Sequence, residues 1–306
     1  MSEFRIATRD ELWSRGVLFE RRLSHGMAED RGAEIVASNA PERSLVDACD
    51  ALMESMRPVV ARFTDARVRA VATVREIASH VIAEATMTVA MRGLSIVTTP
   101  QDALEDVAML RALAAQAPAV DRPLLPIVWL NGSAAVLLHE AAGHAAEHDA
   151  APVDWPSWLS VEDDPPFDVD DAGAPAERRD LLRQRPSCLR RASFRDVPLP
   201  RMTRVVARQH DAPFELPDAR IEVHLAAGGA YEPLSDEVTV DVAVAYVVEG
   251  ARSSRLQPFT YRASRAAVAR SLAGAEGDAI RYPGVVCSRE GQELVVGSHA
   301  PLILTR

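Results

Sequence analysis

Long β-like segments in the second half of the chain constrain the fold more than any other feature of the sequence. Residues 219–225, 237–249 and 294–304 alternate polar and apolar side chains or run apolar. The glycine pair Gly228 and Gly229 separates the first two segments. Alternation with a period of two is typical of strands that bury one face. The chain after about residue 190 is therefore predicted to be a largely antiparallel β region.

The first half of the chain mixes helical and strand-like patterns. Residues 44–78 carry apolar side chains at helical spacing, which predicts a helix kinked at Pro58. Residues 80–97 favour strands, and residues 102–115 predict a second helix that ends before Pro118. This order of elements predicts an α+β fold.

We expect two domains on this basis. Residues 1–125 would form an N-terminal region of helices and strands, packed with a β-rich C-terminal domain of residues 126–306. In the second domain, an apolar strand at 126–130 precedes a predicted helix at 134–147.

Composition excludes several classes of function. The 306 residues are 48% hydrophobic and 25% charged, which is typical of globular proteins, and no apolar run approaches the ~20 residues of a membrane helix. The net charge of −10, with arginines scattered among acids, argues against nucleic acid or a membrane as a partner. The sequence has no lysine, so lysine-based phosphate binding or catalysis is excluded. Without a leader-like N-terminal segment, a cytoplasmic location is expected.

Five chemically active residues gather within ten positions of the helix predicted at 134–147. They are His139, Glu140, His144, Glu147 and His148. Such a cluster is a poor pattern for core packing, whereas histidine and glutamate are common ligands and bases at metal centres. The sequence therefore indicates a metal site on this helix.

The spacing of the histidines leaves two motifs open. His139 and His144 are five residues apart, which places them about 140° apart on a regular α-helix. They can share one ion only if the helix widens by a π-type turn or ends near Gly143. His144 and His148 instead fit the inverted motif H-x-x-E-H, with ideal i, i+4 ligands. Regular helix geometry alone favours this second motif.

Three widely spaced cysteines, Cys49, Cys188 and Cys287, do not suggest a disulfide framework. A functional cysteine here would be a metal ligand or a nucleophile, although most single cysteines are buried small hydrophobic residues.

Residues 136–149 resemble the H-E-x-x-x-H motif of the TldD/PmbA family of metallopeptidases, which lies in an apolar helix followed by acidic residues. Four later segments match the family in the same order. They are 168–175 (an aspartate pair and a Gly-x-Pro turn), 198–203 (Pro-Arg-Met), 245–250 (a strand and turn) and 283–292 (Cys-x-x-x-Gly-Gln, continued by Gly297 and Pro301). The resemblance covers residue 126 to the C-terminus, and the N-terminal region is shortened by comparison.

The resemblance implies a zinc-dependent peptidase for unfolded or flexible peptides. His139, His144 and Cys287 would bind one zinc ion, and Glu140 would be the general base on zinc-bound water. Two neutral imidazoles and a thiolate leave a fourth position for water, as a catalytic zinc site requires. The resemblance thus reverses the preference for the inverted motif.

Several neighbouring residues are weaker candidates. Glu147 and Asp149 could orient the ligands through hydrogen bonds or be solvated. His148 best fits a solvated helix end, and a hydrogen bond that supports a ligand is its next interpretation. Gly228 and Gly229 could let an extended peptide approach the backbone, although a plain turn explains them too.

Arg201 has two interpretations. It could bind a substrate carboxylate, or it could pair with Asp170 or Asp171, and we favour the structural pairing.

The resemblance also implies a heterodimer with a related subunit that lacks the zinc motif, and a homodimer stays open. Two other functions stay open as well. The chain could be a metal-stabilised, non-catalytic scaffold or regulatory subunit, or a zinc amidohydrolase that acts on a small biosynthetic intermediate.

Overall fold

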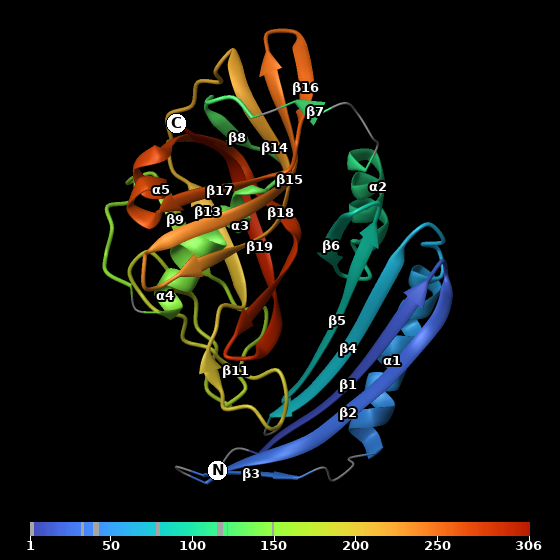
Figure 1. Cartoon of the computed structure of the whole chain (residues 1–306). Coiled ribbons are helices and arrows are strands. Elements are labelled where there is room, and N and C mark those ends of the chain that lie inside the picture. Colours follow the sequence, from blue (N-terminus) through green and yellow to red (C-terminus); the bar gives the residue numbers. More distant parts are fainter. Residues whose placement is uncertain are drawn as a thin grey trace.

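The computed structural model describes residues 3–31, 34–38, 43–77, 80–114, 119–120, 122–148 and 150–306. These residues form an N-terminal sheet, backed by helix α1, that stands beside a larger and strongly curled β region (Figure 1). Strands predominate among the described residues and helices are few, so the predicted α+β class is confirmed. No helix among the described residues is long and apolar enough to cross a membrane.

The N-terminal sheet is an antiparallel sheet in the order β3-β2-β1-β4-β5-β6. Its strands are β1 (Glu3–Ser14), β2 (Val17–Arg31), β3 (Glu34–Ser38), β4 (Arg67–Ile77), β5 (His80–Met91) and β6 (Leu94–Thr98). Two-residue turns join β1 to β2 at Arg15-Gly16 and β5 to β6 at Arg92-Gly93. All four turn residues have positive φ, as hairpin turns of type I′ require.

Helix α1 (Arg43–Val60) packs along this sheet, mainly against β4 and β1. Its buried side chains recur every three or four residues, as an amphipathic helix requires. They are Leu45, Cys49, Met53, Met56 and Val60. Helix α2 (Ala103–Leu113) lies next to β6 and confirms the helix predicted at 102–115.

The prediction of one kinked helix over 44–78 is wrong in its second half. The helix ends at Val60, two residues after Pro58, and residues 67–77 form strand β4. Val68 and Ala70 are buried and alternate with the exposed Arg67 and Arg69, so a period of two prevails at the start of β4, before both faces become buried from Ala72 to Arg75.

The curled β region contains the remaining elements and is largely antiparallel, as predicted. Only the pairs β13–β19, β14–β8 and β16–β7 are parallel among the described strands. The strands are β7 (Ala119–Val120), β8 (Ile127–Trp129), β9 (Leu159–Asp163), β10 (Arg179–Asp180), β11 (Leu189–Arg190), β12 (Leu199–Pro200), β13 (Arg204–Gln209), β14 (Ala219–Glu232), β15 (Glu237–Glu249), β16 (Arg252–Leu256), β17 (Phe259–Ser264), β18 (Leu272–Arg289) and β19 (Gln292–Thr305), with helix α5 (Arg265–Ser271).

A short helical segment occupies the interior of this curled region. It consists of α3 (Ala134–Leu138), a π-helical turn η1 (His139–His144) and α4 (Ala145–Glu147). Every residue of α3 is fully buried, and α3 contacts β13, β14, β15 and β19. The all-apolar start of this helix is therefore explained by its position in the core.

Several contacts join the N-terminal sheet to the curled region, among them a strand pairing and an ion-pair cluster. Val97 of β6 pairs with Gly284 of β18. An ion-pair cluster of Arg75, Glu84, Asp171 and Arg190 lies at a second junction. In this cluster Arg190 Nη2 lies 3.3 Å from Glu84 Oε1 and Arg190 Nε lies 3.4 Å from Asp171 Oδ2, while Arg75 also pairs with Glu84.

Candidate metal centre

The helix that carries the candidate ligands widens at the place where the spacing of the histidines required it. Residues His139–His144 form the π-helical turn η1, between the regular turns of α3 and α4. A π turn brings residues five apart to the same side of the helix. The two imidazole rings accordingly lie edge to face, with centroids 4.9 Å apart and planes at 81°. The predicted π-type distortion is confirmed.

Gly143 has a packing role in this turn. A Cβ built on Gly143 would overlap the Sδ atom of Met202, so no larger residue fits there without moving that side chain. The helix does not end at Gly143. Its glycine instead lets the π turn approach residues 201–202, which the resemblance had singled out as part of the Pro-Arg-Met segment.

Cys287 of β18 completes the group, although it is 143 positions from His144 in the chain. Its Sγ atom lies 3.2 Å from His144 Nε2. One potential ligand atom from each of His139, His144 and Cys287 lies within 4.8 Å of the others. Both His139 and Cys287 are almost fully buried. The fold therefore brings together the three residues that the resemblance assigned to the metal.

His139 is the strongest sign that this group fits a metal ion. Neither of its ring nitrogens has a hydrogen-bond partner among the described residues, although the side chain is completely buried. Burial, His144 and Arg201 lower the pKa of His139 well below its usual value, so the imidazole is neutral. A buried, neutral imidazole without partners is costly unless something else coordinates it. Two imidazoles and one sulfur are donors that suit zinc.

Glu140 lies beside these ligands in the same π turn. It is buried, its Oε2 atom has no hydrogen-bond partner among the described residues, and this atom is 3.8 Å from His144 Nε2. Burial raises the pKa of Glu140 to about 7, with a further contribution from the negative charge of Glu147 and an opposing one from His144. A carboxyl group with a pKa near neutrality is suited to proton transfer.

Glu147 holds His144 from the opposite side. Its Oε2 atom is 3.0 Å from His144 Nδ1, and its Oε1 atom accepts the backbone N–H of Met202 at 2.8 Å. Burial alone would lower the pKa of His144, but hydrogen bonds with Cys287 and Glu147 raise it to about 11. Because an imidazole binds metal only when neutral, a metal bound at Nε2 would displace a proton.

Arg201 is fully buried behind Cys287. Its Nη2 atom donates to Cys287 O at 2.8 Å and to Cys287 Sγ at 3.1 Å, and its Nη1 atom donates to Gln292 O. Its nearest carboxylate is Glu147, with Nε 3.5 Å from Oε1. No local sequence pattern predicts the contact between Arg201 and Cys287. The resemblance includes both segments that carry these residues, Pro-Arg-Met and Cys-x-x-x-Gly-Gln, but does not pair them.

The predicted pairing of Arg201 with Asp170 or Asp171 is wrong. Asp170 accepts the backbone N–H groups of Ala172, Ala174 and Leu189 and so shapes its own loop. Asp171 pairs with Arg190 in the ion-pair cluster. Both carboxylates therefore already have partners other than Arg201, and the sequence does not show these partners.

The inverted motif is not assembled in this structure. His148 is exposed at the end of α4, where its ring lies 6.1 Å from the ring of Tyr231. Among the described residues, the group of potential metal ligands contains His139, His144 and Cys287 and leaves His148 out. Asp149 lies outside the described residues.

Gly228 and Gly229 lie in a bulged stretch of β14, next to the candidate base. A Cβ on Gly229 would lie 2.7 Å from Glu140 Cγ and 2.5 Å from Thr239 O, whereas one on Gly228 would meet nothing within 4 Å. Both glycines line a cavity of about 270 Å³, together with Val136, one helical turn before Glu140. The opposite wall includes Ser95 of β6, so this cavity lies between the N-terminal sheet and the curled region.

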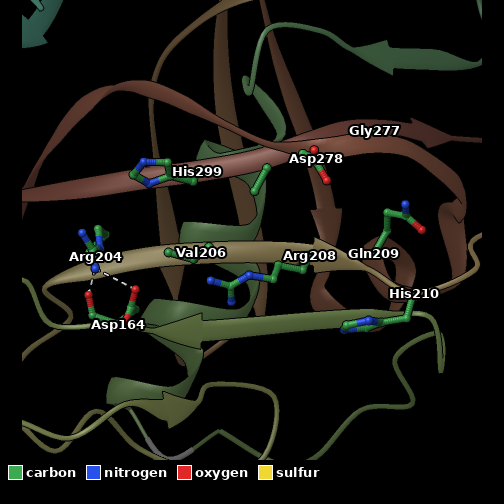
Figure 2. Close-up of a pocket in the computed structure, with 10 residues that line it drawn as sticks. Asp164, Arg204, Val206, Arg208, Gln209, His210, Gly277, Asp278 and His299 are labelled. Carbon is green, nitrogen blue, oxygen red and sulfur yellow. Dashed lines mark hydrogen bonds and ion pairs between the residues drawn. The ribbon is translucent and has the colours of Figure 1, made fainter.

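A second cavity, of about 450 Å³, lies over β13, β18 and β19, and none of the candidate ligands lines it (Figure 2). Its walls include Arg204 and Arg208, but both arginines are already neutralised. Arg204 Nη2 is 2.7 Å from Asp164 Oδ2, and Arg208 pairs with Glu162.

Comparison with known proteins gives a match at the level of fold. No family model matches the sequence, and no curated protein matches it. The structure is similar to TldE from Thermococcus kodakarensis, with a TM-score of 0.54 and 8% identity over 100% of this chain and 96% of that one. It is also similar to a putative modulator of a DNA gyrase from Thermotoga maritima, with a TM-score of 0.54 and 9% identity over 99% of this chain and 95% of that one. The chain thus shares the fold of these proteins.

Proposed function

We propose that this chain is a zinc-dependent peptidase of the TldD/PmbA kind, which hydrolyses flexible peptide segments. His139, His144 and Cys287 would hold the ion. The observation that carries the proposal is the buried imidazole of His139, which has no polar partner among the described residues and lies in one group with His144 and Cys287.

Zinc in this group would supply a Lewis acid that polarises the scissile carbonyl and acidifies water. Glu140 would take a proton from the attacking water at its unpartnered Oε2 atom and return it to the leaving amine. The raised pKa of Glu140 supports both steps, since the carboxyl group can exist in either form near neutral pH. Burial of the site limits competing contact with bulk solvent.

The cavity lined by Gly228 and Gly229 supports a peptide substrate, although neither Glu140 nor a candidate ligand lines it; Gly229, which packs against Glu140, links the two. The cavity is lined by uncharged side chains and by the backbone of the bulged stretch of β14 at Gly228 and Gly229. A cavity of about 270 Å³ holds a short extended segment and excludes a folded domain. Irregular strand backbone of this type can hydrogen-bond an extended peptide.

We propose further that the chain acts as a dimer, either with a related subunit that lacks the zinc motif or with a second copy of itself. Strand β2 exposes the apolar side chains of Val17, Phe19 and Leu23, which supports a protein partner at the N-terminal sheet. Sedimentation of the wild type and of a Phe19→Ser variant tests this proposal. A wild type that remains monomeric alone and with candidate subunits would contradict it.

The test of the peptidase proposal compares the wild type with Glu140→Gln. We expect the variant to retain one zinc ion per chain and to lose hydrolysis of unfolded peptides by at least about 100-fold, because it loses proton transfer but no ligand. Glu249→Gln, which changes an exposed glutamate on β15, is the matched control and should keep full activity.

Small amides should be assayed beside the peptides. Hydrolysis of small amides alone would replace the peptide substrate with a biosynthetic one. Stoichiometric zinc without any hydrolysis would favour a metal-stabilised scaffold. Full peptidase activity in Glu140→Gln would overturn the assignment of the base.

A further inference from the structure

Arg201 makes unusual contacts for a completely buried arginine. Its guanidinium group has four polar neighbours. Three of them are uncharged backbone oxygens or sulfur: Cys287 O, Cys287 Sγ and Gln292 O. The remaining neighbour, Glu147, lies 3.5 Å from a guanidinium nitrogen that has no hydrogen-bond partner among the described residues. A permanent positive charge in the interior is unfavourable without a closely placed negative group.

Arg190, in the ion-pair cluster, shows what a fully compensated arginine looks like in this fold. It is also buried, but it contacts the carboxylates of both Glu84 and Asp171. At Arg201, the Sγ atom of Cys287 takes the place that a second carboxylate has around Arg190. The guanidinium of Arg201 thus gives the Sγ atom of Cys287 a buried N–H donor at 3.1 Å.

Glu147 provides the second half of the arrangement. One of its oxygens holds His144 Nδ1, and the other accepts the backbone N–H of Met202, the residue after Arg201. With Nδ1 engaged in this way, His144 directs Nε2 toward Cys287 Sγ. Two candidate ligands that are far apart in the sequence, His144 and Cys287, are thus each held by a buried side chain. Glu147 holds His144, and Arg201 holds Cys287.

We infer that Arg201 and Glu147 are positioning residues of the metal centre, with distinct targets. Arg201 fixes Cys287 and tunes its sulfur through an N–H···S hydrogen bond, while Glu147 fixes the ring of His144 so that Nε2 faces the ion. The inference rests on the proposed metal site, and it goes beyond it by assigning how this chain orients its ligands and adjusts their donor strength.

Cobalt(II) is a suitable probe, because its sulfur-to-metal charge-transfer band reports directly on the cysteine ligand. We expect Arg201→Met to weaken cobalt binding by about 10- to 100-fold, measured by competition with a chromophoric chelator. The charge-transfer band should move to longer wavelength, since a sulfur without the N–H donor holds its electrons less tightly. Arg190→Met removes an equally buried arginine and should change neither the affinity nor the band.

Two further variants separate the roles and guard against misfolding. Arg201→Lys keeps the positive charge and should bind cobalt with intermediate affinity. Glu147→Gln should weaken binding by about 10-fold or more, because it removes the charged partner of His144, but should leave the band in place. Circular dichroism establishes that each variant is folded at the temperature of the titration.

The outcomes distinguish this inference from the proposed function. Normal cobalt affinity and an unchanged band in both Arg201 variants would overturn the inference while leaving the metal site intact. An equal loss of affinity in Arg190→Met would show a general effect of stability and would overturn it too. A wild type that binds no cobalt would overturn the metal site and this inference with it.

Discussion

Two groups of buried charged residues in this molecule invite comparison. The ion-pair cluster at the junction with the N-terminal sheet gives each charged side chain a partner of opposite sign. Single atoms of that cluster, Arg75 Nε and Asp171 Oδ1, lack a partner in the part of the chain that the structure describes, but each of its side chains has at least one. The ligand cluster, defined as His139, Glu140, His144, Glu147, Arg201 and Cys287, instead leaves the whole imidazole of His139 without any polar partner among the described residues. Buried polar groups are normally satisfied, so the difference separates a structural group from one arranged to bind something else.

The largest effect should come from removing a ligand. Cys287→Ala should lower the zinc content from one ion per chain to nearly none, because two histidines alone make an incomplete site. Metal analysis of the dialysed protein measures this. His148→Ala is the control and should keep its zinc, whereas loss of zinc only in His148→Ala would restore the inverted motif.

The ion-pair cluster should respond through stability. Glu84→Gln leaves Arg75 and Arg190 with one carboxylate fewer, and we expect the free energy of unfolding to fall by about 2 kcal/mol, less than for a fully buried pair because Glu84 is partly exposed. Its zinc content should be unchanged. Loss of zinc without loss of stability would break the distinction between the two clusters.

The stability difference between the wild type and Glu84→Gln should depend on pH. Burial raises the pKa of Glu84, but Arg75 and Arg190 outweigh it and lower the pKa below its ordinary value of 4.5. A lowered pKa in the folded state means that the stabilisation is complete above about pH 5 and is lost as the pH falls through the folded-state pKa. Urea unfolding of wild type and Glu84→Gln should therefore converge at acidic pH. A difference that grows on acidification would contradict this.

A smaller change is expected at Tyr282, a satisfied polar group in the wall of the cavity. Its hydroxyl group accepts the N–H of Ala226 and donates to the carbonyl of Ala226, at 2.9 Å each, and so fixes the bulged stretch of β14. Tyr282→Phe should cost about 1–2 kcal/mol in chemical denaturation, because two backbone groups lose their partner. An unchanged stability would show that the bulge holds without it.

The smallest and opposite effect should come from His139→Leu in the metal-free protein. Replacing an unpartnered buried imidazole with an apolar side chain should leave stability unchanged or raise it by about 1 kcal/mol, while zinc binding is lost. Thermal unfolding in the presence of a chelator measures this. A large destabilisation would mean that His139 has a structural role, as in the ion-pair cluster.

The sequence predicted the α+β class from local patterns. The spacing alone favoured the inverted motif; once the resemblance selected His139 and His144, their five-residue separation required a distorted or ended helix, and the structure has the π turn. The proximity of Cys287 to that turn came from the resemblance, because no local pattern links a late strand to a helix 143 residues earlier.

The errors have long-range causes. The sequence of residues 67–77 is compatible with a helix. These residues form a strand because they pair with β1 and β5, and the segment's own sequence does not show those pairings. The sequence predicts a pairing of Arg201 with Asp170 or Asp171, but Asp170 binds the backbone of its own loop and Asp171 pairs with Arg190. Both errors arose where a distant partner decided between two locally acceptable structures.

Strand β18 carries both Cys287 and, three residues earlier, Gly284, which pairs with Val97 of the N-terminal sheet. That separation is about 10 Å of extended chain, too short to absorb much movement. Any shift of the N-terminal sheet that widens the cavity therefore pulls on the same strand that presents the sulfur. The position of the N-terminal sheet and the geometry of the candidate ligands are in this way mechanically linked through a single segment of backbone.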